Sequence, residues 1–166
     1  RVNSSLTYPC NFMFVASMNP CPCGFYGSID KKCTCSPDMI NRYIGKVSGP
    51  LLDRIDIQID VTPVKYQKLA NNDKPETSTE IKARVNKARK IQNDRYKNYG
   101  IFSNSELTPN LTEKYCKLDE ASNKIIQNAF ERLGLSARGY GRILKVARTI
   151  ADLEGKENIS SSHVAE

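Results

Sequence analysis

The sequence predicts an α/β fold in the first part of the chain and a larger all-α part after it. A compact apolar run predicts one buried strand at residues 12–17. A strict alternation of apolar and polar residues predicts a second strand, with one solvated face, at residues 55–61. From residue 76 onward the apolar residues recur at a helical spacing, which predicts helices.

The change of period coincides with a polar stretch typical of a linker. With 166 residues the chain is long enough for one ordinary domain, or for a small domain and part of another. The polar stretch contains Asn71, Asn72, Asp73 and Pro75. The sequence therefore predicts three parts: residues 1–62, a linker at residues 63–75, and a helical domain at residues 76–166.

The composition is that of a folded protein with an excess of positive charge. Hydrophobic residues make up 39% and charged residues 26% of the chain, which is typical of globular proteins and not of disordered ones. The sequence has no long apolar segment and no leader, so we expect a cytoplasmic protein without a membrane partner. The formal charge of +7 favours a polyanionic partner such as DNA or nucleotide phosphates, and a solvated cationic surface is the alternative.

The first predicted strand is followed by Asn19 and Pro20. Proline disfavours a helical conformation in the residue before it, so Asn19 should lie with its amide exposed at the end of the strand. The ends of strands are where α/β proteins place groups that contact ligands. An amide there can orient a water or polarise a phosphate oxygen, and a simple turn is the alternative.

Four cysteines follow in a CxCx9CxC pattern: Cys21, Cys23, Cys33 and Cys35. Gly24 and Gly27 can turn the chain back, so that four thiolates converge on one tetrahedral ion. We therefore expect a structural Zn²⁺ site that holds together a loop too polar to form its own core. Reduced thiols or a redox pair are the alternatives.

Arg54 separates a predicted helix from the second predicted strand. The helix is predicted to begin after Ser36 and to end at Gly49. A guanidinium held on a rigid element can meet a phosphate with its forked donors. Because two aspartates lie nearby, a surface ion pair is an equally good interpretation of Arg54.

The first helix of the predicted helical domain is strongly basic. Thr77 and Glu80 have the form of a capping box that begins this helix. Its cations favour contact with DNA, and a solvated basic face is the alternative. The candidate DNA-binding residues are Lys82, Arg84, Lys87, Arg89 and Lys90.

Further helices are marked by their caps. A short helix is predicted after Pro109, and a longer one from Asp119 to Leu133 with Gly134 as its C-cap. Another is predicted from Ser136 to Gly155. Ser160 has the form of an N-cap, but a helix as short as the one that follows it is marginal alone.

Arg138 and Arg142 lie four residues apart near the start of the helix after Ser136, so both project from one face. Cations in a first turn oppose the helix dipole. Gly139 and Gly141 each weaken the same turn by about 1 kcal/mol relative to alanine. This unfavourable placement favours a phosphate ligand, with solvated arginines as the alternative.

The combination of these motifs is specific. The stretches AxMNPCPCG, CxC, SGPLLDRIDI and LSARGYGRILKVARTIADLEG together resemble the Mg-chelatase-like AAA+ ATPases of the YifB/ComM family, over nearly the full chain. The resemblance implies the C-terminal portion of a P-loop AAA+ core followed by a helical lid. It also implies a ring, usually hexameric, that binds ATP and Mg²⁺ between subunits.

The resemblance implies a role for three of the candidate residues. Asn19 would be sensor 1, which places the lytic water near the γ-phosphate. Arg54 would be the arginine finger, which reaches the nucleotide of a neighbouring subunit. Arg138 would be sensor 2, projecting from the lid, and Arg142 is the second candidate for contact with the nucleotide.

The family's Walker A loop and Walker B acids are not in this sequence. We therefore expect the sensor and lid portion of a longer protein, which neither binds ATP tightly nor hydrolyses it alone. The two predicted strands should pair directly or leave open edges.

The activity that the resemblance implies is ATP-driven DNA remodelling, such as branch migration in natural transformation or recombination. One alternative is a zinc-stapled nucleic-acid-binding module without catalysis. Another is an AAA+ motor that acts on a protein or on a metal-chelation complex.

Overall fold

The computed structural model describes residues 5–10, 12–61 and 75–166, apart from the side chain of Leu133. The chain forms two compact units, which divide after Ser48. The first unit contains the cysteine segment and helix α1 (Pro37–Ile44), and the second contains all the later helices.

The described residues contain no strand, which corrects the expectation of a two-strand α/β part. Residues 12–17 and 55–61 belong to no ladder, and their apolar side chains apart from Ile55 are exposed, with Met13 at 87% and Val61 at 90%. An apolar run or a period of two favours a strand, but a strand forms only where a neighbour accepts its hydrogen bonds. No described segment supplies that neighbour, so the described chain is mostly helical.

Helix α1 begins as predicted and ends early. The Ser36 side chain accepts a hydrogen bond from the third residue of the helix, at 3.3 Å. The helix ends at Gly45, before the predicted end. The glycine and proline that were expected to end it instead begin α2 (Gly49–Leu52), because proline is tolerated in the first turn of a helix.

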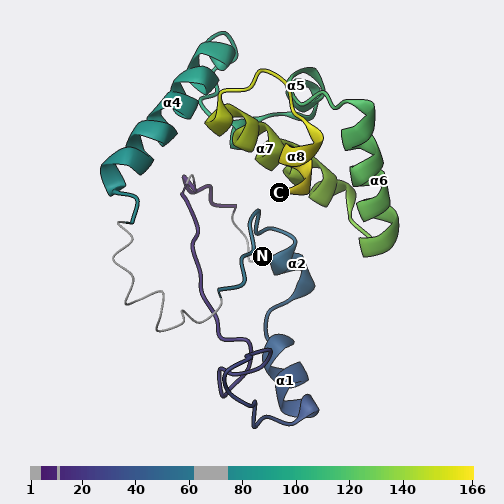
Figure 1. Ribbon diagram of the computed structural model, residues 1–166. Helices are drawn as coiled ribbons and strands as arrows, with labels where there is room; N and C mark the ends of the chain where they lie inside the picture. The colour runs from purple at the N-terminus through teal and green to yellow at the C-terminus, as the bar shows by residue number, and fades with distance from the viewer. Residues whose placement is uncertain (1–4, 11, 62–74) are drawn as a thin grey trace. The chain divides into compact units, whose positions relative to one another are not determined.

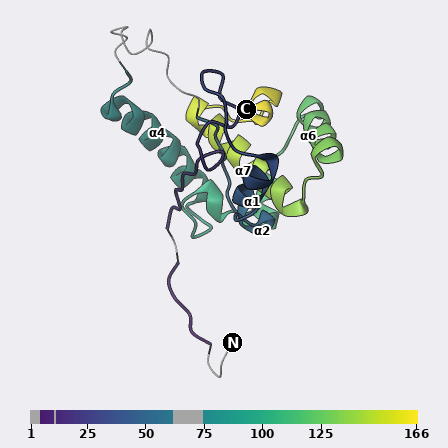
Figure 2. The same ribbon diagram turned by 90° about the horizontal axis from the view of Figure 1, so that it is seen from below.

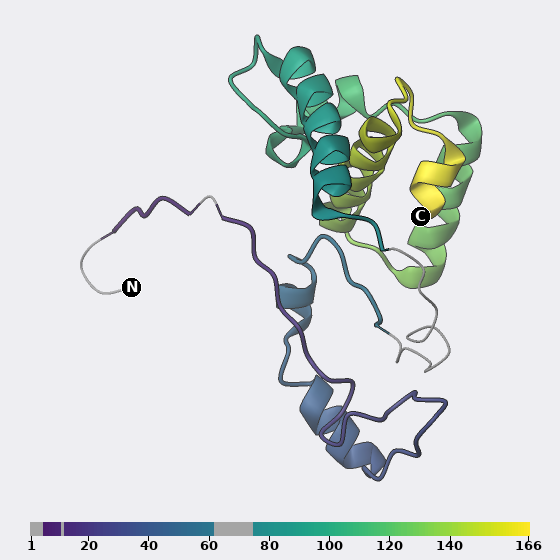
Figure 3. The same ribbon diagram turned by 60° about the vertical axis from the view of Figure 1, so that its left-hand side comes forward.

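The helical part, residues 75–166, is built around its last long helix. Its elements are α4 (Ser78–Tyr96), the 3-10 helix η1 (Asn104–Glu106), α5 (Pro109–Tyr115), α6 (Glu120–Leu133), α7 (Ala137–Glu154) and α8 (Ser161–Ala165). Helix α7 lies between α4 and α6 in each view (Figure 1, Figure 2 and Figure 3). It packs against α4, α5 and η1, while α8 packs against both α6 and α7.

The predicted helix boundaries in this part are confirmed at their caps. Thr77 and Glu80 form both hydrogen bonds of the capping box, at 3.3 and 2.7 Å. Ser136 accepts from the third residue of α7 at 3.1 Å. Gly134 ends α6 at a φ of +60°, a left-handed conformation that glycine adopts without a Cβ penalty.

The core of the helical part is one cluster of buried side chains. It contains Tyr96, Leu107, Cys116, Ile126, Leu144, Ala147, Ala151 and Ile159. Val164 of α8 packs against this cluster, so tertiary packing stabilises a helix that is too short to be stable alone. None of the described helices combines the length and the apolar character needed to cross a bilayer.

Helix α4 contributes to this core only through its C-terminal half. Ala88, Gln92 and Tyr96 are buried along one stripe. Ile81 and Val85 continue the same stripe toward the N-terminus, yet they are 41% and 42% exposed. The predicted apolar face therefore exists, but only part of it is covered by described residues.

Candidate functional site

The structure brings the four predicted metal ligands together. The Sγ atoms of Cys21, Cys23, Cys33 and Cys35 all lie within 4.8 Å of one another. The separations are 3.3 Å between Cys21 and Cys23, 3.5 Å between Cys23 and Cys33, and 3.7 Å between Cys21 and Cys33. A tetrahedral zinc ion with Zn–S bonds of about 2.3 Å places its sulfurs about 3.8 Å apart. The cluster therefore has the spacing of a closed four-thiolate site.

A tight turn positions the first pair of cysteines. The Gly24 N–H donates to the Cys21 carbonyl at 3.0 Å, and Gly24 has a φ of +81° that favours glycine. The turn directs the backbone N–H groups of Phe25 and Tyr26 to the Cys21 sulfur. Backbone donors around a sulfur favour its thiolate form, which is the form that binds a metal.

The four thiols differ in acidity. Hydrogen bonds from the backbone of Thr34 and Phe25 lower the pKa of Cys23 to about 5. The backbone N–H of Cys35 favours the Cys33 thiolate, but burial and the neighbouring sulfurs outweigh it and raise the pKa of Cys33 to about 12. One thiolate thus forms readily, and a divalent cation at the centre would favour ionisation of the others. Soft thiolate ligands in tetrahedral geometry suit zinc.

The first unit has little else to hold it together. Among its described residues only Cys21 and Ile40 are buried, and all of its cysteines are free thiols. A unit this small, without an apolar core, commonly needs a metal or a disulfide for stability. The donor set, its spacing and the missing core all fit a structural metal.

Asn19 is exposed and lies two residues before the buried Cys21. The strand that was expected to position it is not formed within the described residues. Its role as sensor 1 therefore stays a prediction.

Arg54 follows α2 and is exposed. Its Nη1 donates to the carbonyl of Pro50, so the side chain folds back along α2. The described residues offer it no ion pair, and the predicted surface ion pair with a neighbouring aspartate is not formed.

The two arginines near the start of α7 have different surroundings. Arg138 is exposed and has no hydrogen bond or ion pair with the described residues. The Arg142 side chain is 20% exposed, and its Nη1 donates to the Ile55 carbonyl at 3.0 Å. Its Nη2 lies 4.0 Å from Asp53 Oδ1. The structure thus connects Arg142 to the segment that carries Arg54.

The glycines beside these arginines are explained only in part. The Gly139 N–H is the donor that caps α7 by bonding to Ser136. A Cβ at Gly141 would meet no described atom within 4 Å, so packing does not require glycine there. Close approach of a phosphate stays a prediction for Gly141.

The five candidate DNA-binding residues all lie exposed on α4. Arg84 forms an ion pair with Glu76, at 2.5 Å between Nη1 and Oε1. The others form no ion pair with the described residues. At about 100° per residue, Lys87 and Lys90 lie on the far side of α4 from the buried stripe. Lys82, Arg84 and Arg89 flank that stripe. The exposed surface that these five cations share is called the basic face of α4.

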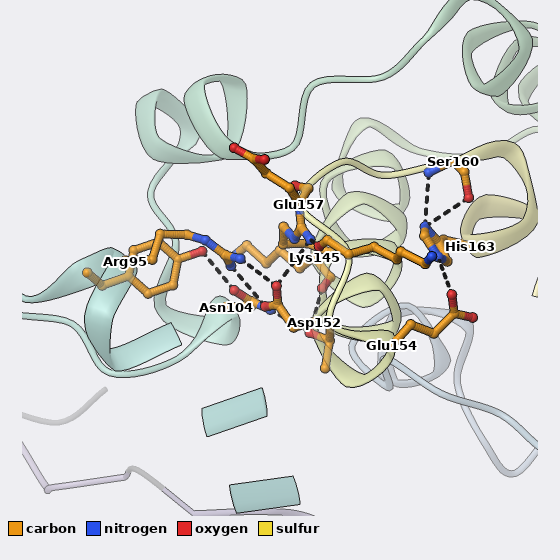
Figure 4. A network of polar contacts seen from close by, with 12 residues as sticks. Arg95, Asn104, Lys145, Asp152, Glu154, Glu157, Ser160 and His163 are labelled. Carbon is orange, nitrogen blue, oxygen red and sulfur yellow. Dashed lines mark hydrogen bonds and ion pairs between the residues drawn. The ribbon is translucent and has the colours of Figure 1, made fainter. Parts of the chain in front are cut away.

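Sequence reasoning missed a buried polar network on α7. Figure 4 shows Asp152 at its centre, reached by Arg95 from α4 and by Asn104 from η1. The Asp152 side chain is 0% exposed, and Arg148, one turn earlier on α7, lies 3.1 Å from its Oδ1. The available signal was a charged pair at i and i+4 inside an otherwise apolar helical stripe.

His163 also has a partner on the preceding helix, in addition to one in its own stretch of sequence. Its Nδ1 accepts from the Ser160 N–H at 2.9 Å, and its Nε2 lies 3.1 Å from Glu154 Oε2 (Figure 4). The ring is 4% exposed and holds α8 against the end of α7. The nearby sequence gives no sign of this contact, because Glu154 belongs to the preceding helix.

Comparison with known proteins places both parts of the chain in one family. A family model described as "Magnesium chelatase, subunit ChlI C-terminal" matches residues 75–166, and one described as "Magnesium chelatase, subunit ChlI" matches residues 1–69. The chain belongs to the magnesium chelatase family. Within it, the similarity is to the YifB/ComM group of AAA+ related proteins, as the sequence motifs predicted.

Three relatives illustrate the extent of this similarity. The "Competence protein ComM" of Haemophilus influenzae is 40% identical over all of this chain and 32% of its own length. The "Uncharacterized protein YifB" of Escherichia coli is 35% identical over the same shares. An uncharacterised protein of Mycobacterium tuberculosis is 34% identical over 95% of this chain and 31% of its own length. The chain thus spans about a third of the length of these magnesium chelatase family members.

Proposed function

We propose that this chain is the sensor and lid portion of a ring-forming AAA+ ATPase that remodels DNA. The observation that carries the proposal is the match of both parts of the chain to magnesium chelatase family models. The complete protein would form a homo-hexameric ring with ATP and Mg²⁺ between subunits. Alone, this portion would neither bind ATP tightly nor hydrolyse it.

Three exposed polar side chains would act at the nucleotide. Asn19 would orient the lytic water, since a neutral amide both donates and accepts hydrogen bonds. Arg54 would neutralise charge on the nucleotide of the neighbouring subunit, and its exposed guanidinium supports this role. Arg138, without a partner among the described residues, would bind a phosphate in the subunit's own site.

Arg142 would connect these groups. Its guanidinium is engaged with the Ile55 carbonyl, one residue beyond Arg54. If a bound nucleotide shifts Arg138, α7 shifts with it. Arg142 on the same helix would then move the segment that carries the arginine finger. Direct contact of Arg142 with the nucleotide would require that hydrogen bond to break.

DNA is the partner that the charge distribution favours. The basic face of α4 and the formal charge of +7 support binding to a polyanion. The relative from Haemophilus influenzae is named a competence protein. We propose branch migration of DNA junctions, in natural transformation or recombination, as the task of the motor.

The cysteine cluster would hold a structural Zn²⁺ through the sulfurs of Cys21, Cys23, Cys33 and Cys35. Bound zinc would offset part of the negative charge of the four thiolates and cross-link the first unit. This chain's own contribution is the turn at Gly24 and the backbone donors that favour the thiolates.

The deciding experiment is ATP turnover by the complete protein, with and without four-way DNA junctions, for the wild type and for Arg54→Ala. We expect junctions to stimulate turnover and the substitution to lower kcat by about a thousandfold or more. Arg132→Ala, which removes an exposed arginine of α6, is the matched control and should keep wild-type turnover.

The other outcomes identify the competing functions. Turnover that ignores DNA would indicate a motor that acts on a protein or a metal-chelation complex. Absence of turnover would favour a zinc-stapled nucleic-acid-binding module, a function that the cysteine cluster and the basic face of α4 also support.

A further inference from the structure

A cleft of about 340 Å³ opens in the helical part, between the end of α4, α5 and the turn that follows α7. Its ionisable lining is dominated by cations, with one acid: Arg95, Lys114, Lys117, Arg148 and Glu157. None of the residues assigned above to nucleotide, zinc or DNA lines this cleft. It is a separate concentration of positive charge.

The two arginines of the cleft share a single carboxylate. Arg95 donates to both oxygens of Asp152, at 2.5 and 2.9 Å, and Arg148 Nη2 lies 3.1 Å from Asp152 Oδ1. Asp152 is fully buried, and the Arg148 side chain is only 3% exposed. Two guanidinium charges against one carboxylate leave one positive charge uncompensated, in surroundings where an unbalanced charge is costly.

Arg148 also has an unused hydrogen-bond donor. Its Nη1 donates to the Glu157 carbonyl and its Nη2 to the Lys156 carbonyl, both at 2.6 Å. Its Nε is buried and has no partner among the described residues. An unsatisfied buried donor costs free energy, so an acceptor brought by a ligand would be stabilised there.

The other charged groups of the lining do not supply the missing anion. Lys114 and Lys117 are exposed and add positive charge. Lys114 Nζ donates to the Tyr99 hydroxyl at 2.7 Å, which fixes the position of its ammonium without neutralising it. The Glu157 carboxylate is directed away from the Asp152 network in Figure 4, and it forms no ion pair with the described residues.

We propose that this cleft binds one phosphate group of a bound DNA strand. Guanidinium groups and ammonium groups together are the usual protein ligands of a phosphate. The position of Arg95 supports a strand as the source of that phosphate, because Arg95 lies eleven residues after Arg84 and so projects from nearly the same side of α4. At 1.5 Å per residue, Arg84 and Arg95 are about 17 Å apart along α4, a length that several successive phosphates cover.

This inference rests on the proposed function, which supplies DNA as the partner. Its test is the salt dependence of binding of the 166-residue chain to a fluorescein-labelled single-stranded oligonucleotide, measured by anisotropy. The cleft variant is Lys114→Gln/Lys117→Gln. The matched control, Lys124→Gln/Arg132→Gln, removes the same charge from α6, a helix that contributes nothing to the cleft.

Loss of one phosphate contact should make the slope of log K against log[salt] shallower by about 0.7. A fourfold rise in salt should therefore weaken binding of the cleft variant about 2.6-fold less than binding of the wild type. The control should keep the wild-type slope. Glu157→Gln removes the acid of the lining and should strengthen binding. A gain in binding cannot result from poor folding, so this variant tests the cleft even if the lysine variant folds poorly.

Two further variants separate this inference from the proposed function. If Lys87→Gln/Lys90→Gln on α4 makes the slope shallower while the cleft variant keeps the wild-type slope, DNA remains the partner and the cleft assignment is overturned. If the wild type binds no DNA, both are overturned. If inorganic phosphate shifts the amide signals of Lys117 and Ile159 while DNA does not, the cleft is a site for a free anion and the DNA assignment is wrong.

Discussion

Arg95 of α4 and Asp152 of α7 form a two-pronged ion pair between residues that are 57 positions apart in the sequence. Asn104 of η1 also donates to Asp152, at 2.9 Å, and its own side-chain oxygen accepts from the Tyr96 hydroxyl at 2.7 Å. A buried carboxylate is tolerated only when it is paired and hydrogen-bonded. This network therefore specifies how α4, η1 and α7 meet, and it makes stability sensitive to any change at Asp152.

Replacing Asp152 with alanine should lower the free energy of unfolding by about 3–5 kcal/mol, because the buried guanidinium of Arg148 and the partly buried one of Arg95 lose their partner. Urea unfolding followed by circular dichroism measures the change. Glu120→Ala is the control, since Glu120 pairs with Lys124 on the exposed surface of α6 and should cost less than about 1 kcal/mol. Equal losses in the two variants would contradict the central role of Asp152.

Removal of metal should unfold the first unit and leave the helical part intact. We expect protein purified without chelator to carry about one zinc per chain and Cys33→Ser to carry much less. Cys10→Ser is the control, because Cys10 is exposed and lies outside the cluster. Elemental analysis and amide spectra before and after chelation give the two readouts. Four reactive thiols together with a zinc content far below one per chain would exclude the site.

The stability of the helical part should fall between pH 9 and pH 11 through Cys116. Burial raises the pKa of its thiol from 9.0 to about 11. The folded state therefore keeps the thiol neutral while the unfolded state ionises. This contribution is fully present below pH 9 and is lost as the pH rises through 11, with a size of about 3 kcal/mol.

Chemical unfolding at pH 8.5 and pH 11 measures this loss. Cys116→Ala should lose less stability over that range than the wild type does, whereas Cys10→Ala, at an exposed position, should behave like the wild type. Identical pH dependence in all three proteins would rule out the buried thiol as its source.

Alanine substitutions of Arg138 and Arg142 should affect stability differently, although the two residues lie one turn apart. Arg142→Ala removes the hydrogen bond to Ile55 and should destabilise the second unit by about 1 kcal/mol. Arg138→Ala should leave stability unchanged, because Arg138 is exposed and has no described partner. Thermal unfolding of this chain tests both variants. In the complete protein, Arg138→Ala should instead weaken nucleotide binding. If Arg138→Ala lowers stability and Arg142→Ala weakens nucleotide binding, then Arg142 is the nucleotide ligand and Arg138 the structural residue.

Local signals in the sequence were sufficient for the helix caps and for the convergence of the four cysteines. Thr77, Ser136 and Gly134 act on the turn beside them, so their residue types alone predicted the ends of helices. The cysteine spacing predicted this convergence for the same reason, because one loop, residues 24–32, brings the two close pairs of cysteines together.

The remaining features depend on contacts between distant residues. The predicted strand at residues 55–61 has the right period but no described partner. Nothing near Arg142 in the sequence reveals that its side chain donates to the carbonyl of Ile55. Asp152 lies in a helical stripe that is otherwise apolar. Its partners Arg95 and Asn104 belong to earlier elements, so the sequence around Asp152 does not indicate them.

The uneven packing of α4 has a consequence for its motion. The backbone hydrogen bonds near Ile81 have no packed side chains of other described elements over them, whereas those near Tyr96 are covered by the buried core. Amide hydrogen exchange should therefore slow progressively along the helix, from rapid local fraying at one end to rates limited by global unfolding at the other. A polyanion bound to the basic face would slow amide exchange most at the N-terminal end of α4. The difference in exchange rate between the two ends of the helix would then be smaller in the bound state than in the free state.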